Sequence, residues 1–236
     1  MKNTVGKIRA AIDKYNMIDK NDNIAVGISG GKDSLVLLWA LNELKKYYPN
    51  KFNITAITLD PCFNGKEMDL SEIKKLCDKL DIKYVVNRTS IWEVVFKIRN
   101  ENNPCSLCAK LRRGILHNIA LENGCNKVAL GHHMDDAVET FFMNIFNGGK
   151  IKCFSPMSYL SRKNIHLIRP MIFCYESEIS NICSNLHLPV CKSMCPIDGN
   201  TERENIKITL NLLEKQYPKL RKKVIGALQD LSINNW

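Results

Sequence analysis

Short apolar runs alternate with longer amphipathic segments along most of this chain of 236 residues. Five of the runs are rich in β-branched residues and bounded by polar residues, which is typical of buried strands. They cover residues 24–28, 52–60, 82–86, 127–131 and 165–169. The pattern therefore predicts a sheet whose strands are separated along the chain by other elements.

The segments between these strands place apolar residues three and four positions apart, the spacing of one helix face. Predicted helices cover residues 1–19, 35–41, 66–80, 91–100, 106–123, 135–147 and 176–186. Because strands and helices alternate, the fold class is α/β, with a doubly wound, mostly parallel sheet and helices on both faces. Ligands of such sheets bind outside the carboxyl ends of the strands, so motifs that follow a strand can share one crevice.

The chain shows no internal repeat and no low-complexity linker. We expect three parts: an N-terminal helix at 1–22, a main domain at 23–200 and a basic helical tail at 201–236. The formal net charge of +10 favours polyanionic partners, nucleic acid first and an anionic membrane surface second. A genome rich in adenine and thymine also raises the Lys and Asn content, so charge alone does not decide the partner.

The hexapeptide Ser-Gly-Gly-Lys-Asp-Ser at 29–34 lies between a predicted strand and a predicted helix. Its glycines let the backbone approach a ligand closely, because they carry no Cβ. The following helix begins with free N–H groups and a partial positive charge, which stabilise an anion. The serines and the lysine add donors, so this turn is predicted to bind phosphate.

A second polar motif, Gly-His-His-Met-Asp-Asp, occupies 131–136 at the end of the predicted fourth strand. Acidic residues at the start of a helix can simply cap it. Histidines beside them can also bind a metal or act as an acid or base. We expect functional roles for His132 and Asp136.

Ten cysteines are many for a chain of this length. No apolar signal core precedes them and no apolar run approaches the roughly 20 residues that span a bilayer, so we expect a cytoplasmic protein without disulfides or membrane spans. Cys105 and Cys108 form a C-x-x-C pair, which suits zinc, a redox dithiol or an iron–sulfur cluster. Cys191 and Cys195, with three residues between them, are candidates to complete such a site.

The turn at 29–34 is too short for a Walker A loop. It resembles the PP-loop of the ATP pyrophosphatase superfamily, and the motif at 131–136 resembles one in the tRNA-thiolating branch of that superfamily. Cys-Ser-Leu-Cys followed by Leu-Arg-Arg-Gly is similar to the tRNA 2-thiocytidine synthetase family. The resemblance covers about residues 24–204 and would make 23–200 a PP-loop ATPase domain, with the adenine nucleotide alpha hydrolase-like fold.

The resemblance implies an enzyme that cleaves ATP between its α and β phosphates with Mg²⁺. The residues it assigns to nucleotide binding are Ser29, Gly30, Gly31, Lys32, Asp33, Ser34, Leu59, Gly131, Asp136 and Arg169. The residues it assigns to catalysis are Lys32, Asp33, His132 and Asp136. For Asp33, a role as a brace of the loop stands beside that of a Mg²⁺ partner.

The resemblance also implies a [4Fe–4S] cluster on Cys105, Cys108 and one later cysteine. We select Cys195, because Cys195-Pro196 followed by Arg203 is similar to a string in the family, and keep Cys191 as the runner-up. Typical members carry a C-x-x-C at this point, and this chain departs from that pattern. The first cysteine is Cys62, so the N-terminal zinc cysteines of the thiouridine branch are missing, which favours the cytidine branch.

The implied activity is that of an ATP-dependent tRNA sulfurtransferase. It would adenylate the C2 carbonyl of an anticodon-loop cytidine and replace the oxygen with sulfur. One alternative is a related enzyme that thiolates tRNA uridine or another acceptor. An alternative of another class is a non-catalytic RNA-binding module with zinc or a cluster. The implied partners are tRNA and a sulfur donor such as a cysteine desulfurase or sulfide, and relatives suggest a homodimer.

Overall fold

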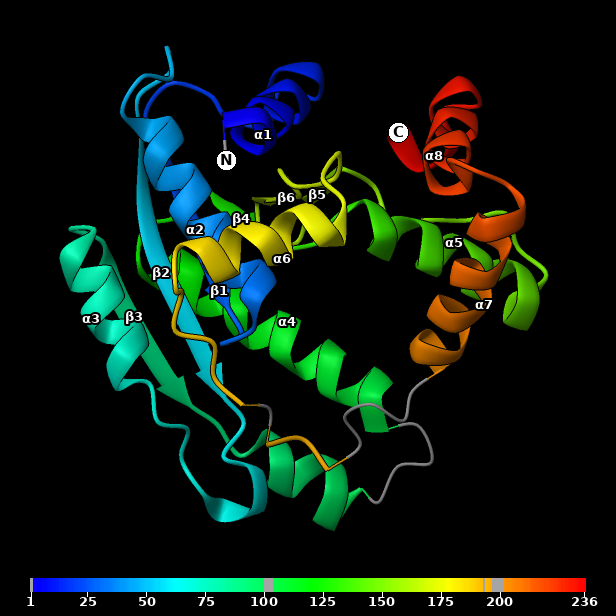
Figure 1. Cartoon of the computed structure of the whole chain (residues 1–236). Coiled ribbons are helices and arrows are strands. Elements are labelled where there is room, and N and C mark those ends of the chain that lie inside the picture. Colours follow the sequence, from blue (N-terminus) through cyan, green and yellow to red (C-terminus); the bar gives the residue numbers. More distant parts are fainter. Residues whose placement is uncertain (1, 100–103, 193, 197–201) are drawn as a thin grey trace.

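The computed structural model describes residues 2–99, 104–192, 194–196 and 202–236 (Figure 1). One six-stranded sheet lies at its centre, in the order β3-β2-β1-β4-β6-β5. The strands are β1 (Asp22–Ile28), β2 (Phe52–Asp60), β3 (Lys83–Arg88), β4 (Lys127–Ala129), β5 (Met157–Leu160) and β6 (Ile165–Ile168). The first four strands and β6 pair in parallel, which confirms the predicted doubly wound sheet.

Helices cover both faces of the sheet, as predicted. They are α1 (Lys2–Lys14), α2 (Lys32–Lys45), α3 (Ser71–Lys79), α4 (Pro104–Glu122), α5 (Met134–Gly148), α6 (Glu176–Asn185), α7 (Glu202–Gln216) and α8 (Leu220–Asp230). Short helical turns add η1 (Phe63–Gly65), η2 (Glu93–Ile98) and η3 (Ile233–Asn235). None of the helices formed by these residues is long and apolar enough to cross a bilayer.

Strand β5 was not predicted. It pairs antiparallel with β6 through a short turn in which Asn164 has a φ of 49°. Its sequence, Met-Ser-Tyr-Leu, holds four residues and no β-branched one, so it gives little local strand signal. The predicted helix at 66–80 begins only at Ser71, because Asp60 accepts the backbone N–H of Met68 and holds the preceding residues in a loop.

The period of two along β1 divides the core between the two faces. Ile24 and Val26 lie in the larger apolar cluster with α1, α2, α5 and α6, whereas Ala25 lies in the smaller cluster under α4. The predicted C-terminal tail is also helical. Ile206 of α7 and Ile225 of α8 lie in the larger cluster, so both helices share the main core.

The strand order reverses at the boundary between β1 and β4, since β2 and β3 follow on one side and β6 on the other. In open parallel sheets this reversal leaves a crevice at the carboxyl ends of the two strands. The 29–34 turn follows β1, and the 131–136 motif follows β4. The topology therefore brings the two predicted motifs to one place.

Candidate active site with two adjoining cavities

The 29–34 turn is braced by its own serines. The Ser34 hydroxyl accepts the Ser29 N–H at 3.1 Å and donates to the Gly31 carbonyl at 2.9 Å. The Ser29 hydroxyl accepts the Gly31 N–H at 3.3 Å. Gly30 has a φ of +84°, a conformation that favours glycine. No side chain caps α2, so the N–H groups at its start face the crevice as anion donors.

The 131–136 motif packs directly on this turn. A Cβ built on Gly131 would lie 3.1 Å from the backbone carbon of Asp33 and from the nitrogen of Ser34. Such contacts are with backbone, which cannot rotate away. Glycine at this position therefore allows β4 and the start of α2 to lie against each other.

Lys32 and Asp33 form a charged group with Glu176 of α6. Lys32 Nζ lies 3.0 Å from Glu176 Oε1 and 3.1 Å from Asp33 Oδ1. Burial alone would raise the pKa of Glu176, but hydrogen bonds from Lys207 and Lys32 outweigh it and lower the pKa to about 2. Asp33 Oδ1 is buried without a hydrogen bond of good geometry among the described residues, which suits a cation at this wall.

His133 is a structural cap. Its Nδ1 accepts the Asp136 N–H at 3.4 Å, and its own N–H donates to Asp136 Oδ2 at 2.9 Å, so the two residues form a capping box at the start of α5. This bond occupies one oxygen of Asp136, a residue of the cavity described below. The capping interpretation was made for the acidic residues of this motif, and here Asp136 caps α5 together with His133.

His132 is half-buried and lies on the wall of the cavity that contains Asp136. Its ring lies 5.0 Å from that of Phe154, and burial, with Arg169 nearby, lowers the pKa of His132 to about 4. The imidazole is therefore neutral near pH 7 and can exchange hydrogen bonds without carrying a charge. Its Nδ1 has no hydrogen-bond partner among the residues that the structure describes.

Arg169 lies behind His132. Its guanidinium sits 4.8 Å from the centre of the Phe154 ring and donates to the Ser155 carbonyl at 2.6 Å. Only 8% of Arg169 is exposed, and the residue is outside the walls of both cavities described below. Its assignment to phosphate or RNA stays a prediction, and the observed contacts support the position of His132.

The first cavity, of about 390 Å³, opens at the carboxyl ends of β1, β2 and β4. One wall is apolar and includes Ile57, Leu59 and Leu130. The opposite wall is polar and is formed by Ser29, Asp33, Ser34, Gly131, His132 and Asp136. Six of the ten residues assigned to the nucleotide by resemblance line this cavity: Ser29, Asp33, Ser34, Leu59, Gly131 and Asp136. The cavity therefore has an apolar side for a base and a donor-rich side for phosphates.

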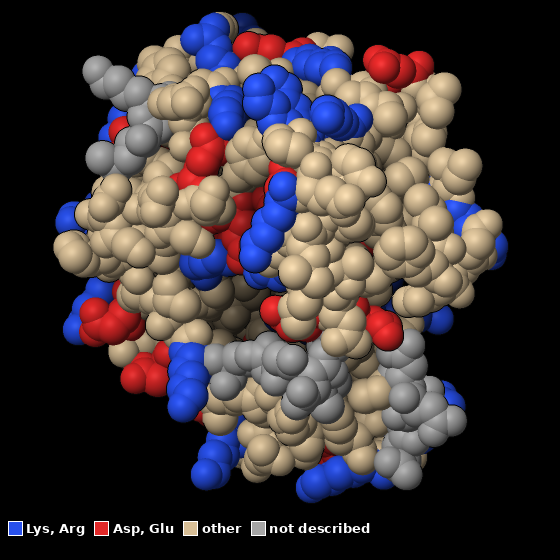
Figure 2. Space-filling view, turned by 45° about the vertical axis from the view of Figure 1, so that its right-hand side comes forward, with Lys and Arg blue, Asp and Glu red and all other residues tan. Residues whose placement is uncertain are grey.

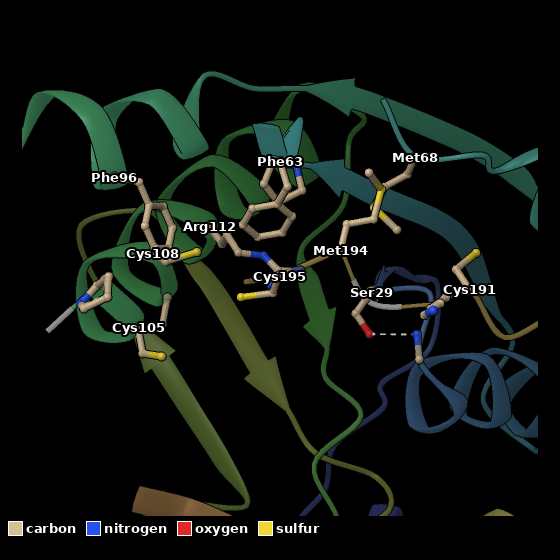
Figure 3. Close-up of a pocket in the computed structure, with 15 residues that line it drawn as sticks. Ser29, Phe63, Met68, Phe96, Cys105, Cys108, Arg112, Cys191, Met194 and Cys195 are labelled. Atoms are coloured by element: carbon tan, nitrogen blue, oxygen red, sulfur yellow. Dashed lines mark hydrogen bonds between the residues drawn. The ribbon is translucent and has the colours of Figure 1, made fainter. Parts of the chain in front are cut away.

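The second cavity, of about 360 Å³, contains the cysteines (Figure 3). Cys105 and Cys108 come from the first turns of α4, and Cys191 and Cys195 from the segment after α6. Its remaining wall is mainly apolar and includes Phe63, Met68, Phe96 and Met194. Ser29, Ala109 and Arg112 line both cavities, so the two are adjacent.

The structure separates the two candidates for the third thiol. Burial raises the pKa of Cys105, and the neighbouring Cys195 thiol raises it further. Cys195 also raises the pKa of Cys108. Cys191 instead lies at the other side of the cavity, where its thiol donates to the Asp69 carbonyl at 3.6 Å (Figure 3). The geometry thus groups Cys195 with the C-x-x-C pair.

The four thiols line one cavity and do not form a closed set of metal ligands among the described residues. Within the described ranges, no three Cys, His, Asp or Glu side chains stand close enough together to hold a metal ion. All ten cysteines lie in those ranges, and none forms a disulfide there. The soft thiols and the apolar wall nevertheless match the donor set of an iron–sulfur cluster.

Helix α7 contributes residues that sequence reasoning did not place in the site. Arg203 Nη1 lies 3.1 Å from Asp136 Oδ1, and Lys207 Nζ lies 2.8 Å from Glu176 Oε2. Arg203 and Lys207 are four positions apart, near the start of a helix that follows the cysteines. This spacing of two basic residues is the local signal that could have indicated contacts with the acidic residues of the site. Figure 2 shows acidic and basic side chains lying together in a hollow on this face.

The doubly wound sheet and the glycine-rich turn at its reversal point define a nucleotide-binding α/β protein. A family model described as a PP-loop domain matches residues 3–211. Among curated relatives, a protein of Citrifermentans bemidjiense named tRNA-cytidine(32) 2-sulfurtransferase is 34% identical over 98% of this chain and 90% of its own length. One from Aliivibrio fischeri with the same name is 37% identical over 94% and 72%. The chain therefore belongs to the PP-loop family, in the group of the tRNA-cytidine 2-sulfurtransferases.

Solved structures agree with this placement. The U34-tRNA thiolase NcsA from Methanococcus maripaludis, solved with its [4Fe-4S] cluster, has a TM-score of 0.80 at 28% identity, over 98% of this chain and 78% of that one. An NH3-dependent NAD synthetase from Campylobacter jejuni has a TM-score of 0.53 at 18% identity, over 97% and 91%. The second likeness shows the fold alone.

Proposed function

We propose that this protein is an ATP-dependent tRNA sulfurtransferase that converts an anticodon-loop cytidine to 2-thiocytidine. One observation carries the proposal: the cavity with the phosphate-binding turn and the cavity with the thiols share Ser29, Ala109 and Arg112. A substrate atom at this common wall is within reach of both. The names of the curated relatives, which specify cytidine 32, support cytidine as the acceptor.

ATP binds with its base on the apolar wall near Leu59 and its phosphates on the 29–34 turn. Backbone N–H groups and Lys32 stabilise the pyrophosphate as it leaves. Asp33 and Asp136 are the carboxylates on this wall, and they would hold a Mg²⁺ ion, which would offset the negative charge of the phosphates. His132, neutral at pH 7, offers a hydrogen bond to the nucleotide or the base.

The reaction has two substitutions. The cytidine C2 carbonyl oxygen attacks the α-phosphorus, the bond to pyrophosphate breaks, and the oxygen becomes part of an adenylate. A sulfur nucleophile at the oxidation level of hydrosulfide then attacks C2, and AMP departs with the original oxygen while one proton is released. A cytidine of the anticodon loop can turn out of its stack and lie against the wall that the two cavities share. Its C2 carbonyl is then accessible to ATP and to the sulfur nucleophile.

Cys105, Cys108 and Cys195 would hold a [4Fe–4S] cluster in the second cavity. When bound by three thiolates, such a cluster has one iron without a protein ligand, which can present sulfur for transfer. Arg112, on the shared wall, places a positive charge beside these thiols and lowers the pKa of Cys108 against the effect of burial. It thereby favours the thiolate that metal binding requires.

The partners follow from the same reaction. Lys110, Arg112 and Arg113 on α4 and the exposed Lys222 and Lys223 on α8 are suited to tRNA phosphates. The sulfur comes from a donor such as a cysteine desulfurase or free sulfide. We also propose a cytoplasmic location, where tRNA is present, and a homodimer as the assembly to test.

Nucleoside analysis of tRNA tests the function. A strain that lacks this gene should lose 2-thiocytidine, and the intact gene should restore it, as measured by mass spectrometry of digested tRNA. A copy carrying Asp33→Asn should fail to restore it, whereas Asp230→Asn, at the end of α8, should succeed. Loss of 2-thiouridine with 2-thiocytidine unchanged would favour the uridine alternative, to which the structural likeness to a U34-tRNA thiolase also points.

A further inference from the structure

Cys195 is flanked in sequence by two attachments to the ATP site. On one side, the Cys191 N–H donates to the Gly30 carbonyl at 2.9 Å. This approach is tight, since a Cβ on Gly30 would lie 3.1 Å from the Cβ of Cys191. On the other side, Arg203 at the start of α7 reaches Asp136. Both contacted residues belong to the motifs that we assign to ATP.

The attachment through Arg203 is a fork of three contacts. Its Nη1 lies 3.1 Å from Asp136 Oδ1 and 3.3 Å from Glu139 Oε2, and its Nη2 lies 3.1 Å from Thr140 Oγ1. The second oxygen of Asp136 is already occupied by the His133 N–H at 2.9 Å. A planar guanidinium fits this row on α5, whereas an ammonium group cannot reach all three acceptors at once.

This attachment joins a partly exposed guanidinium to a buried carboxyl group. The Glu139 side chain is only 5% exposed, and burial raises the pKa of Glu139 to about 7, while Arg203 acts in the opposite direction. Without the guanidinium, two neighbouring carboxylates on α5 would repel each other in a poorly hydrated place. The start of α7 is therefore fixed to the helix that carries Asp136.

Lys207, one helical turn further along α7, is connected to the 29–34 turn through Glu176 of α6. Lys207 Nζ lies 2.8 Å from Glu176, and the other oxygen of Glu176 lies 3.0 Å from Lys32. If Lys32 turned to the phosphates of a bound ATP, Glu176 would keep Lys207 as its basic partner among the described residues. Occupancy of the ATP site would then change the charges around Glu176 and Lys207.

We propose that Cys191 and Arg203 are positioning residues that link the placement of Cys195 to occupancy of the ATP site. Cys191 acts through its backbone N–H and Arg203 through its guanidinium, and neither serves as a metal ligand. The inference rests on the proposed function, because it assumes that ATP binds at the 29–34 turn. The proposal gives Cys191 a role at the place where it lies, since it donates its N–H to Gly30 and is apart from Cys105 and Cys108.

The test is the alkylation rate of individual thiols in the full-length, metal-free protein. Samples with and without Mg²⁺ and a saturating non-hydrolysable ATP analogue are treated with N-ethylmaleimide, and peptides are quantified by mass spectrometry. In the wild type, the analogue should slow alkylation of Cys195 by about threefold or more, because it restricts local opening around that thiol. Cys105, on α4, is the internal reference and should change much less.

Variants separate positioning from simple shielding by the nucleotide. Arg203→Met should abolish protection of Cys195 although the analogue still saturates the site, and Arg203→Lys should be intermediate. Lys215→Met, an exposed residue on the same helix, is the matched control and should retain protection. Cys191→Ala removes the thiol but keeps the backbone N–H, so it should also retain protection.

Calorimetry on the same samples makes the outcomes distinct. Analogue binding without protection of Cys195 in the wild type would overturn this inference and leave the proposed function standing. Equal protection in Arg203→Met and the wild type would do the same, since shielding would then explain it. Failure of the analogue to bind at all would overturn the proposed function together with the inference.

Discussion

The nucleotide cavity and the cysteine cavity are built in different ways. The first is formed by the ends of β1, β2 and β4 and by the starts of α2 and α5, and its polar groups already bond to each other. The second joins the start of α4 to the segment after α6, and the described thiols are too far apart for a metal. The ends of the strands and the starts of two helices form the first cavity, whereas segments from distant parts of the chain form the second.

This difference has a physical cause. Strand register and helix N-termini fix backbone N–H groups without help from a ligand, so phosphate donors are present before ATP arrives. Thiols are weak hydrogen-bond partners, and those of Cys105 and Cys108 are disfavoured as thiolates by burial and by Cys195. A cation that binds thiolates would supply the missing free energy.

The largest expected effect separates the two late cysteines. After anaerobic reconstitution, Cys195→Ser should lose most of its iron, from about four atoms per chain to less than about one, because a cluster needs its third thiolate. Cys191→Ser should keep the iron. Iron, zinc and sulfide analysis measures both, and calorimetry should show unchanged ATP binding in each.

The reverse result, with iron lost from Cys191→Ser and kept in Cys195→Ser, would contradict the grouping of the thiols. Stoichiometric zinc without iron under strict anaerobic conditions would favour the non-catalytic RNA-binding module instead.

The next prediction concerns a substitution that changes the nucleotide cavity and leaves the cysteine cavity intact. Lys32→Met should lower the rate of AMP formation by about 10²–10³, since it removes a charge aimed at the leaving pyrophosphate. The iron content should stay that of the wild type. Lys46→Met, at the exposed end of α2, serves as the control. A Lys32→Met protein with normal AMP formation would remove the turn from the mechanism.

A smaller effect tests the close packing of the two motifs. Gly131→Ala places a methyl group against backbone atoms 3.1 Å away, so overpacking should lower the free energy of unfolding by about 1–3 kcal/mol. Gly114→Ala is the matched change, because nothing lies within 4 Å of its added Cβ and alanine favours the helix. Urea denaturation checks both, and equal stability of the two variants would count against this packing.

The last prediction concerns pH, and its effect on the free energy of unfolding is spread over more than two pH units. The unfolded chain protonates His132 as the pH falls through about 6.5, but the folded protein does so only near 4, because the ring is buried. The free energy of unfolding should therefore fall as the pH drops through this interval, by up to about 3 kcal/mol from this group. His132→Gln should flatten that slope in urea titrations, whereas His187→Asn, at an exposed residue, should leave it. An unchanged slope in His132→Gln would mean that the imidazole is not buried as described.

Local patterns could predict the nucleotide cavity well but the cysteine cavity only in part. The βα turns at 29–34 and 131–136 are contiguous motifs, and their meeting follows from parallel topology alone. Strand β5 lacks β-branched residues, so only its pairing with β6 reveals it. The choice of Cys195 could be made by resemblance to a family string, and its spatial grouping needed the structure.

Contacts across long sequence separations were out of reach for pattern reasoning. Arg203 and Asp136 are 67 positions apart, and Lys32 and Glu176 are 144 apart. Neither pair has a period or spacing that would connect its members. The sequence around Arg169 likewise gives no sign that its guanidinium and the His132 ring contact the same Phe154 ring.

The central claim is that the two cavities act on one base, and a single assay tests it most directly. Reconstituted protein is incubated anaerobically with unmodified tRNA, ATP, Mg²⁺ and sulfide, and AMP and thiolated nucleosides are quantified together. The account predicts 2-thiocytidine and AMP in equal amounts once AMP formed without tRNA is subtracted, and neither product with Lys32→Met above background. AMP formation without any thiolated nucleoside, or 2-thiocytidine formed without ATP, would contradict it.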